Sequence, residues 1–309
     1  MEKENTERML LLVQGISGSG KTYFSKKWAE EKPLERIRLN FDDIRTMLGK
    51  YWVPEREDLV ESIFKHSLNL AMLKGSDIVI DNYSNLNPKR FKEFESIVDQ
   101  FNKTSDIKYK IYTKVIDTPL EICIERDSKR DIPIGEKVIK SQYKKYLPFF
   151  VSYRIKQIPK LEQDVKLPHC IIVDLDGTLC YNITGRPFFG PEAAERVHED
   201  ILVEPIADLV TRFCSSEAVE SEFIVITGRD ESMRKATLDW LDAHWLYPSK
   251  LIMRSTKDFT SGPEYKLSAF NTYIKDKYFV EFVLDDMQSC VDMWRNLGLV
   301  CLQPNKGNL

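Results

Sequence analysis

The chain has 309 residues, which exceeds one ordinary domain and predicts about two. Hydrophobic residues at 42% and charged residues at 30% are typical of globular α/β proteins, and they exclude a disordered or membrane-embedded chain. The formal net charge of -3 gives no overall basic footprint for nucleic acid, so any such binding has to come from local clusters of basic residues.

The six cysteines are scattered and include no Cys-x-x-Cys pair, which favours a reducing cytosol over secretion. The first eight residues are highly charged, and the apolar run at residues 9–13 is too short for a signal peptide or a membrane span. We therefore expect a cytoplasmic protein without a membrane segment.

The first candidate site is a glycine-rich loop at residues 15–22, GISGSGKT, between a predicted strand at residues 9–14 and a predicted helix at residues 22–31. Glycines let backbone N–H groups wrap phosphate oxygens, and the helix N-terminus adds a favourable dipole. The loop predicts binding of ATP or another nucleoside triphosphate, with Lys21 at the β- and γ-phosphates and Thr22 on Mg²⁺. The alternative is a simple glycine turn. The residues assigned to the nucleotide are Gly15, Ser17, Gly18, Ser19, Gly20, Lys21 and Thr22.

Asp42 is the candidate catalytic base of this first site. It follows a predicted strand at residues 36–39 and opens a helix, a position from which a carboxylate can accept the proton of an acceptor hydroxyl. The alternative is that Asp42 or Asp43 caps the helix, a common role of aspartate. The local pattern leaves both open. Further strands at residues 77–80 and 109–116 alternate with helical patterns, which predicts βαβ units and a parallel sheet.

Arg126 and Arg130 lie on or beside a helix that follows the predicted strand at residues 109–116, where P-loop kinases carry a lid. A lid arginine neutralises the charge that develops on a transferred phosphoryl group. The spacing alone favours the alternative, a solvated charged face.

A domain boundary is predicted where the sequence becomes polar and irregular, at residues 153–168, with Pro159 and Pro168 as breakers. We expect one domain at residues 1–158 and another at residues 159–309. Strand patterns at residues 170–175, 223–227 and 279–284, with helical stretches at 204–214 and 232–243 between them, predict a second α/β sheet.

The second candidate site begins with Asp174 and Asp176 at the end of an apolar strand, where alternation points both carboxylates to one side. Asp174 could attack phosphorus, while Asp176 protonates the leaving oxygen and later activates water. A solvated aspartate pair at a capped turn is the alternative reading.

Two later strand ends argue against that alternative. Thr227, Gly228 and Arg229 follow one strand and could hold phosphate, and Asp285 with Asp286 follows the next and could bind Mg²⁺ beside Asp174. Lys266, on a helical stretch between them, would supply positive charge. Concordance across several strand ends favours a phosphatase site.

These residues resemble the four motifs of the haloacid-dehalogenase (HAD) phosphohydrolase superfamily. The chain as a whole resembles phage-type bifunctional polynucleotide 5′-kinase/3′-phosphatases over nearly its full length. The fold that this implies is α/β in two domains, an N-terminal P-loop kinase with a parallel sheet and a C-terminal HAD-like Rossmannoid phosphatase. The more specific matches are Asn40-Phe41-Asp42-Asp43-Ile44-Arg45, Asn85-Leu86-Asn87-Pro88, Asp127-Ser128-Lys129-Arg130, Gly185-Arg186-Pro187 and Met293-Trp294-Arg295.

The resemblance implies an enzyme of RNA or DNA repair that phosphorylates 5′-hydroxyl ends and removes 3′-phosphates, with ATP and Mg²⁺ as cofactors. It implies RNA or DNA ends as substrate, an RNA or DNA ligase as a partner, and the cytosol of a bacterium or of a phage host as the location. A homo-oligomer is left open. The resemblance implies catalytic roles for Lys21, Asp42, Arg130, Asp174 and Asp176, and ATP binding for Arg126. It implies acceptor or substrate binding for Arg45, Asn85, Asn87, Arg186, Thr227, Gly228, Arg229 and Lys266. Mg²⁺ binding is implied for Thr22, Asp174, Asp176, Asp285 and Asp286.

The sequence departs from the family pattern at two places. Family members carry acidic residues shortly before the motif lysine, whereas here only Glu264 precedes Lys266. Tyr83 and Ser84 stand where an acid and a threonine are expected.

Two other functions fit the same motifs. One is a P-loop kinase fused to a HAD phosphatase that acts on a metabolite. Only Arg45, Arg130, Arg186 and the Asn-Leu-Asn-Pro segment distinguish a polynucleotide enzyme from such a protein. The other is a nucleic-acid-binding scaffold with two inactive sites, which the intact Lys21 and Asp174 disfavour.

Overall fold

A computed structural model describes residues 7–215, 221–256 and 258–305. Contacts between Cα atoms divide the chain into two compact units, Met1–Leu147 and Pro148–Leu309. The division falls inside helix α6 (Glu136–Lys156), which carries Pro148 in its interior. The boundary at residues 158/159 stays a sequence prediction, and each unit is described by itself.

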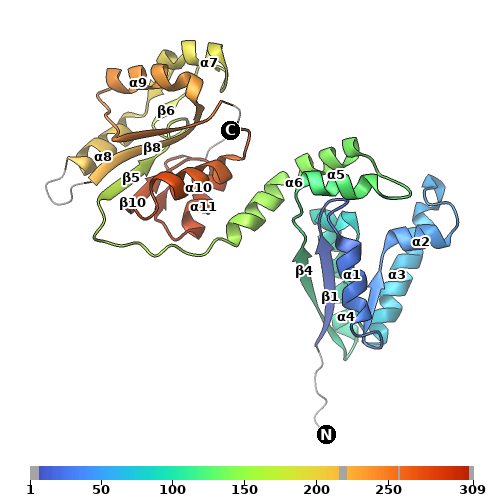
Figure 1. The fold of residues 1–309 in the computed structure, drawn as a ribbon. Coiled ribbons are helices and arrows are strands. Elements are labelled where there is room, and N and C mark those ends of the chain that lie inside the picture. Colours follow the sequence, from blue (N-terminus) through green and yellow to red (C-terminus); the bar gives the residue numbers. More distant parts are fainter. Residues whose placement is uncertain (1–6, 216–220, 257, 306–309) are drawn as a thin grey trace, which may run out of the picture. The chain divides into compact units, whose positions relative to one another are not determined.

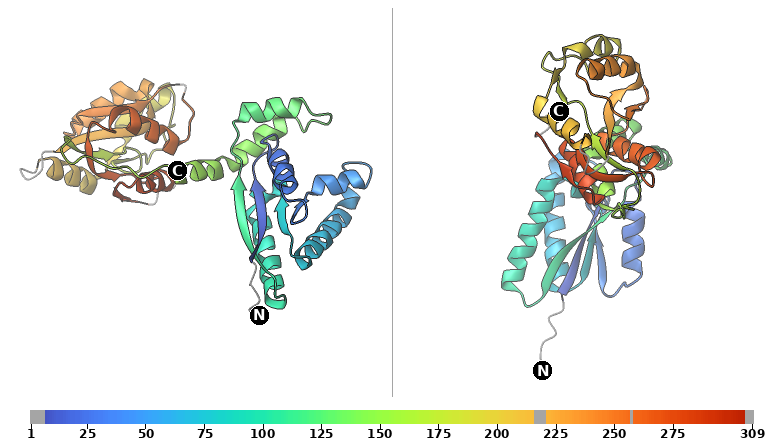
Figure 2. Two further views of the ribbon diagram at one scale, coloured as in Figure 1. Left: turned by 60° about the horizontal axis from the view of Figure 1, so that its bottom comes forward. Right: turned by 90° about the vertical axis from the view of Figure 1, so that its left-hand side faces the viewer.

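The N-terminal unit is built on a parallel sheet with the strand order β2-β3-β1-β4 among its described residues. Helices connect the strands and pack around the sheet (Figures 1 and 2). The strands are β1 (Glu7–Gln14), β2 (Arg36–Leu39), β3 (Asp77–Ile80) and β4 (Lys108–Val115). The helices are α1 (Lys21–Glu30), α2 (Phe41–Met47), α3 (Glu57–Leu73), α4 (Pro88–Thr104) and α5 (Leu120–Ser128), with the short 3-10 helices η1 (Pro54–Arg56) and η2 (Tyr83–Leu86).

Apolar side chains explain why β1 and β3 lie at the centre of this sheet. Both are continuous apolar runs, as expected for parallel strands that are covered on both faces. Leu10 and Leu12 point to the cluster that packs against α3 and α4, whereas Leu11 and Val13 point to the side of α1. The apolar character of β1 thus fits its central position in the sheet.

The C-terminal unit has a second parallel sheet, with the order β11-β10-β5-β8-β9 among the described residues. Its core joins the inward side chains of β5 and β8 to helices α8 and α9. The strands are β5 (His169–Val173), β8 (Ser221–Asp230), β9 (Lys250–Arg254), β10 (Phe279–Leu284) and β11 (Cys301–Leu302), beside the small pair β6 (Cys180–Tyr181) and β7 (Ile201–Leu202). The helices are α7 (Pro191–Glu195), α8 (Glu204–Cys214), α9 (Arg234–Ala243), α10 (Gly262–Tyr273) and α11 (Gln288–Asn296), with the 3-10 helices η3 (Val197–Glu199) and η4 (Glu231–Met233).

The predicted α/β class and both parallel sheets are confirmed. Strands β2, β3 and β10 and helix α8 have the predicted bounds. The predicted irregular stretch begins too early, because α6 continues to Lys156. In the part of the chain that the structure describes, no helix is both long and apolar enough to cross a membrane.

Candidate active sites

The glycine-rich loop runs from the end of β1 into α1, as the sequence predicts. Gly18 has a φ angle of 80° and lies against α5, so closely that a Cβ atom there would be 2.2 Å from the carbonyl oxygen of Cys123. The side chains of Ser17, Ser19 and Lys21 are buried. The loop therefore has the tight backbone path that brings N–H groups together around phosphate.

Lys21 lies inside this loop. Its Nζ donates a hydrogen bond to the carbonyl oxygen of Ile16 at 2.8 Å. Burial lowers the pKa of Lys21 to about 8, Asp81 opposes this shift and the positive charge of Arg130 adds to it. The amine thus sits in a desolvated place among charges of both signs, where an anionic ligand would restore its full positive charge.

The start of α2 decides between the two interpretations of Asp42. The helix is capped by Asn40, whose Oδ1 accepts from the backbone N–H groups of Asp42 and Asp43. The Nδ2 of Asn40 donates to Asp81 at 3.0 Å, which fixes the cap to the end of β3. The helix-capping interpretation of Asp42 and Asp43 is therefore wrong, and the half-exposed carboxylate of Asp42 is left for other contacts.

Arg45 is held by two carboxylates. It donates to Asp42 Oδ1 at 2.7 Å and bidentately to Glu57, at 3.0 and 2.6 Å, and the hydrogen bond to Glu57 raises its pKa. Burial together with the charge of Asp42 raises the pKa of the nearby Tyr51 to about 12. The predicted base and the predicted acceptor arginine thus belong to one cluster.

The two predicted lid arginines differ in their contacts. Arg126 donates to the carbonyl oxygen of Ser19 at 3.2 Å, so it touches the phosphate loop directly. Arg130 is half-exposed, and its Nε lies 3.6 Å from the buried Asp127. A further contact to the loop comes from α6, where Gln142 Oε1 accepts from the N–H of Ser17 at 2.9 Å.

Asn85 and Asn87 do not share one role. Asn85 is 1% exposed, and its Nδ2 bonds the carbonyl oxygens of Val13 and Ile80 at the ends of β1 and β3. A direct acceptor contact by Asn85 is at odds with this buried position, because its amide protons tie the sheet to η2. Asn87 caps α4 and lines a surface cavity of about 430 Å³ that Arg45 also lines.

In the C-terminal unit, the predicted residues converge at the carboxyl ends of β5, β8 and β10. Lys266 Nζ from α10 lies 3.0 Å from Asp174 and 2.7 Å from Asp285, and all three side chains are buried. Trp294 Nε1 donates to Asp285 at 3.0 Å, and Thr178 donates to Asp286 at 3.2 Å. The four predicted motifs therefore form one site.

The carboxylates of this site can hold a divalent cation. Asp174, Asp285 and Asp286 bring one oxygen each within 4.8 Å of one another. Burial and the charges of its neighbours raise the pKa of Asp174 to about 7, although Lys266 opposes the shift. Carboxylate oxygens are the ligands that Mg²⁺ prefers, and a bound cation would relieve this repulsion. The residues thus fit the predicted Mg²⁺.

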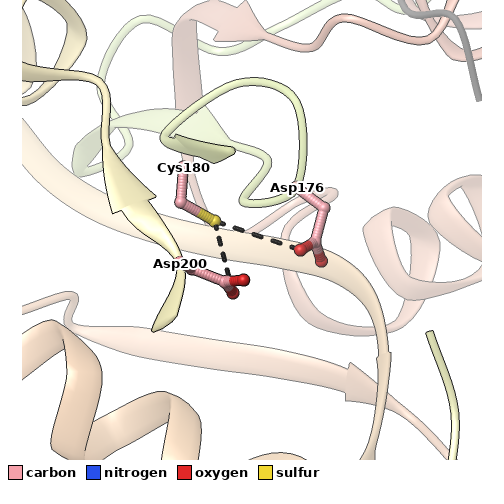
Figure 3. A group of neighbouring side chains, drawn as sticks. All are labelled: Asp176, Cys180 and Asp200. Carbon is pink, nitrogen blue, oxygen red and sulfur yellow. Dashed lines mark hydrogen bonds between the residues drawn. The ribbon is translucent and has the colours of Figure 1, made fainter. Parts of the chain in front are cut away.

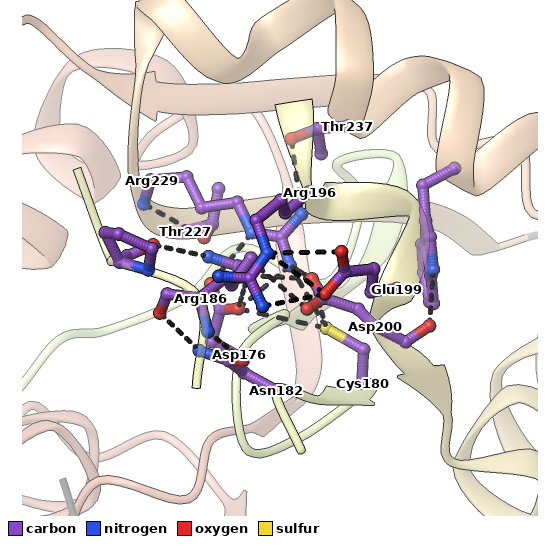
Figure 4. A network of polar contacts seen from close by, with 12 residues as sticks. Asp176, Cys180, Asn182, Arg186, Arg196, Glu199, Asp200, Thr227, Arg229 and Thr237 are labelled. Atoms are coloured by element: carbon purple, nitrogen blue, oxygen red, sulfur yellow. Dashed lines mark hydrogen bonds and ion pairs between the residues drawn. The ribbon is translucent and has the colours of Figure 1, made fainter. Parts of the chain in front are cut away.

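Asp176 lies in a neighbouring network of four charges (Figure 4), of which Arg186, Asp200 and Arg229 are buried and Asp176 is partly exposed. Arg229 donates to both of its oxygens at 2.8 Å, and Arg186 donates to Oδ1 at 2.6 Å. Both guanidinium groups also bind Asp200, which is fully buried. Burial alone would raise the pKa of Asp176, but Arg229 and Arg186 hold it below its ordinary value. Two positive charges therefore balance two negative ones.

A second group of metal-type ligands, Asp176, Cys180 and Asp200, lies within this network (Figure 3). Burial and the charge of Asp176 raise the pKa of the Cys180 thiol, so it stays protonated. A cation would have to displace the two guanidinium groups that already neutralise the carboxylates. The oxygens of Asp176 are bound by arginine in this structure, and the assignment of Asp176 to Mg²⁺ stays a prediction.

A cavity of about 690 Å³ gives access to this site. Asp174, Asp176, Gly228, Arg229 and Lys266 line it. Thr227 is buried beneath it and its Oγ1 accepts from the N–H of Arg229 at 3.2 Å. A ligand in the cavity can therefore meet both a nucleophilic carboxylate and two basic side chains.

Two family models match the chain, one for each unit. Residues 168–309 match the polynucleotide kinase PNKP phosphatase domain, and residues 10–149 match the AAA domain. Each match covers less than half of the chain. The second unit is thus similar to a polynucleotide kinase phosphatase domain, and the first unit to an AAA domain.

The chain is also similar to a curated protein of Autographa californica nuclear polyhedrosis virus, a "putative bifunctional polynucleotide kinase/RNA ligase". The two are 28% identical over 95% of this chain, which spans 42% of that relative's length. Two solved structures, "Structure of the Pnkp1/Rnl/Hen1 RNA repair complex" and "Structure of Pnkp1/Rnl/Hen1 complex", align with TM-scores of 0.45. They cover 100% and 99% of this chain and 100% of their own chains, at 26% and 27% identity.

The sequence did not indicate several residues of these two domains. Asp81 follows β3 in the kinase domain and carried a weak signal, an acid at a strand end. Asp200 in the phosphatase domain has no motif around it, and Gln142 acts from α6, far from the phosphate loop in sequence. These contacts are visible only in three dimensions.

Glu264 also has a different use from the one that the family pattern suggests. It completes the capping of α10 by accepting from Ser261 Oγ at 2.7 Å, and it pairs with Arg154 at 2.6 Å. The partners of Lys266 are Asp174 and Asp285 instead. The missing acids therefore do not leave the motif lysine without carboxylates.

Proposed function

We propose that this chain is a polynucleotide kinase-phosphatase that heals nucleic-acid ends by adding phosphate to a 5′-hydroxyl and removing it from a 3′-end. The observation that carries the proposal is the buried contact of Lys266 with Asp174 and Asp285, in a domain similar to the polynucleotide kinase PNKP phosphatase domain. The P-loop domain before it supplies a site for the phosphate donor. A metabolite as substrate is not favoured by these matches.

In the kinase domain, Lys21 and the loop N–H groups would hold the phosphates of ATP, with Thr22 as a ligand of Mg²⁺. The 5′-oxygen attacks the γ-phosphorus, its proton passes to Asp42, and the bond from the γ-phosphorus to the bridging oxygen breaks to release ADP. Arg126 touches the loop, and Arg130 contributes positive charge near Lys21. Both would stabilise the charge of the transferred group.

In the phosphatase domain, an Asp174 oxygen attacks the phosphorus of the 3′-phosphate and the bond to O3′ breaks, with Asp176 giving a proton to O3′. Asp176 then takes a proton from water, which attacks the aspartyl-phosphate and releases inorganic phosphate. A Mg²⁺ held by Asp174, Asp285 and Asp286 would neutralise negative charge at the reacting phosphate. Lys266 keeps Asp174 and Asp285 in place.

The arginines around Asp176 suit both of its roles. With Arg229 and Arg186 bound, Asp176 is an ionised base, as the water step requires. Arg229 also lines the cavity, where a substrate phosphate would compete for its N–H groups. Because a guanidinium that turns to phosphate no longer stabilises the Asp176 carboxylate, substrate binding would raise the pKa of Asp176 and favour its acid form. Arg229 can therefore bind the Asp176 carboxylate before the substrate enters and the substrate phosphate afterwards.

RNA ends are the substrate that we favour, with a ligase acting next. The two reactions leave a 5′-phosphate and a 3′-hydroxyl, which are the ends that a ligase joins. The baculovirus relative carries RNA ligase in its name, beside polynucleotide kinase. Its greater length leaves room for the joining activity outside the part that this chain matches.

The proposal is tested with four oligonucleotides, RNA and DNA strands that carry either a 5′-hydroxyl or a 3′-phosphate. Transfer of label from γ-labelled ATP to 5′-hydroxyl strands and release of phosphate from 3′-phosphate strands are expected, both with Mg²⁺. Faster reaction on RNA would support the RNA preference, and equal rates would remove it. Turnover of sugar phosphates but of no oligonucleotide would overturn the proposal.

A further inference from the structure

Two aromatic side chains lie in solvent beside the candidate base of the kinase domain. Tyr51 and Trp52 belong to the segment between α2 and η1, and they are 38% and 53% exposed. Tryptophan is on average highly buried, so a half-exposed indole next to a catalytic carboxylate calls for a function. The roles derived above for ATP and for the acceptor hydroxyl use neither ring.

The ring of Trp52 is linked to Asp42 by two successive contacts. Trp52 is connected through Arg45, whose Cζ lies 5.1 Å from the indole centroid and whose Nη1 lies 2.7 Å from Asp42. The exposed indole is therefore separated from the candidate base by one guanidinium group.

Arg45 retains capacity for a ligand in this arrangement. A guanidinium has five N–H donors, and three of them are used, two on Glu57 and one on Asp42. Positive charge beside an exposed aromatic ring is the combination by which proteins hold single-stranded nucleic acid, because phosphate meets the cation and a base stacks on the ring. A small hydroxylated metabolite has no base for the indole to meet.

We propose that Trp52 stacks on the first base of the 5′-hydroxyl strand. This proposal rests on the proposed function of the kinase domain. Stacking on an indole accepts any base, so the site selects a nucleic-acid end without selecting its sequence. The adjoining 430 Å³ cavity has Arg45, Lys89 and Arg90 in its lining, together with Glu57, Glu61 and Glu93, which pair with the two arginines. Lys89 would be its contact for the next phosphate.

The test for Trp52 compares two RNA oligonucleotides that differ only at the 5′-terminal residue, one with a base and one abasic, both with a 5′-hydroxyl. Trp52→Ala should raise KM about tenfold for the strand with a base and leave kcat unchanged, as expected for the loss of one stacking contact. Trp52→Phe should restore most of the affinity. The abasic strand should bind wild type and Trp52→Ala equally.

A matched control is Trp245→Ala, which removes an indole that is 80% exposed in the phosphatase domain and should leave both KM values unchanged. An equal rise of KM on both strands would show that Trp52 only supports Arg45, and it would overturn the stacking role. No rise on either strand would overturn it as well. If wild-type protein phosphorylates neither strand, the proposed function itself fails.

Discussion

Gln142 on α6 accepts a hydrogen bond from the backbone N–H of Ser17, with 2.9 Å between Oε1 and N. Ser17 belongs to the loop whose N–H groups would hold the phosphates of ATP. A protein side chain thus occupies a donor that the nucleotide would use. When ATP binds, either Gln142 is displaced or the phosphates form no hydrogen bond with the N–H of Ser17.

The first prediction concerns this competition. Gln142→Met keeps the length of the side chain and removes the acceptor, so ATP should meet a free N–H and its KM should fall by about 2- to 10-fold, the range of one net hydrogen bond. Initial rates at varied ATP concentration measure this. Gln142→Glu is the matched control and should raise the KM, because a carboxylate repels phosphate. An unchanged KM in Gln142→Met would contradict the competition.

The second prediction is that the two activities can be removed separately. Lys21→Ala should lower 5′-kinase activity by about 100-fold or more, since it deletes the positive charge at the phosphates, and 3′-phosphatase activity should remain. Asp174→Asn should abolish the phosphatase by deleting its nucleophile and should spare the kinase. Both reactions are assayed on each purified variant, with circular dichroism as the check on folding. A folded variant that loses both activities would contradict independent sites.

The third prediction concerns the pH dependence of the phosphatase. Burial and two neighbouring carboxylates raise the pKa of Asp174 to about 7, so the nucleophile is protonated below that pH and activity should fall as the pH decreases through 7. Mg²⁺ stabilises the carboxylate, and increasing its concentration should move this limb to lower pH. The pH profile of kcat/KM, which reports on the free enzyme, is measured at two Mg²⁺ concentrations.

A limb that stays at the same pH at both Mg²⁺ concentrations would separate Asp174 from the metal. The kinase reaction of the same samples serves as the control, because its profile does not depend on Asp174. A shared limb in both reactions would instead indicate a change in ATP or Mg²⁺ binding common to the two assays.

The fourth prediction concerns Asp200, which accepts from both Arg186 and Arg229 while fully buried. Asp200→Asn removes a negative charge and leaves two buried guanidinium groups with Asp176 alone, which should destabilise the phosphatase domain by about 3 kcal/mol. Phosphatase activity should be lost and kinase activity retained. Urea unfolding followed by circular dichroism, compared with wild type, measures the destabilisation, and the two activity assays are run on the folded variant.

Glu199→Gln is the matched control for Asp200→Asn. Glu199 is the preceding residue and pairs with Arg196, but both side chains are partly exposed, at 28% and 30%. Such a pair contributes about 1 kcal/mol or less. Equal destabilisation by the two substitutions would show that the network around Asp200 contributes no more to the free energy of unfolding than the partly exposed pair does.

The sequence predicts the parts of both sites that follow from a local rule. Asp174 and Asp285 each come directly after an apolar strand, Thr227 lies in the carboxyl-terminal half of β8, and the carboxyl ends of parallel strands meet at one edge of a sheet. The glycine-rich loop likewise joins a strand to a helix by its own spacing. Their convergence follows from topology, which alternating strands and helices determine.

Other features depend on contacts that no local pattern encodes. Asp200 lies after a 3-10 helix in an irregular stretch and reaches Asp176 only through two arginines. Helix α6 continues past Pro148, because packing of residues such as Phe150 and Ile155 outweighs the helix-breaking preference of proline. Propensity rules describe single residues in isolation, so tertiary packing of this kind is outside their reach.

Gly177 shows how far a short motif can depend on the rest of its domain. Its φ angle is 86°, and a Cβ atom there would lie 2.3 Å from Oδ2 of Asp286, at the end of another strand. The glycine is thus required by the position of a distant carboxylate as well as by its own turn. A designer who moves the segment Asp174-x-Asp176-Gly177-Thr178 into a different scaffold would have to move the end of β10 with it, because Asp286 packs directly against Gly177.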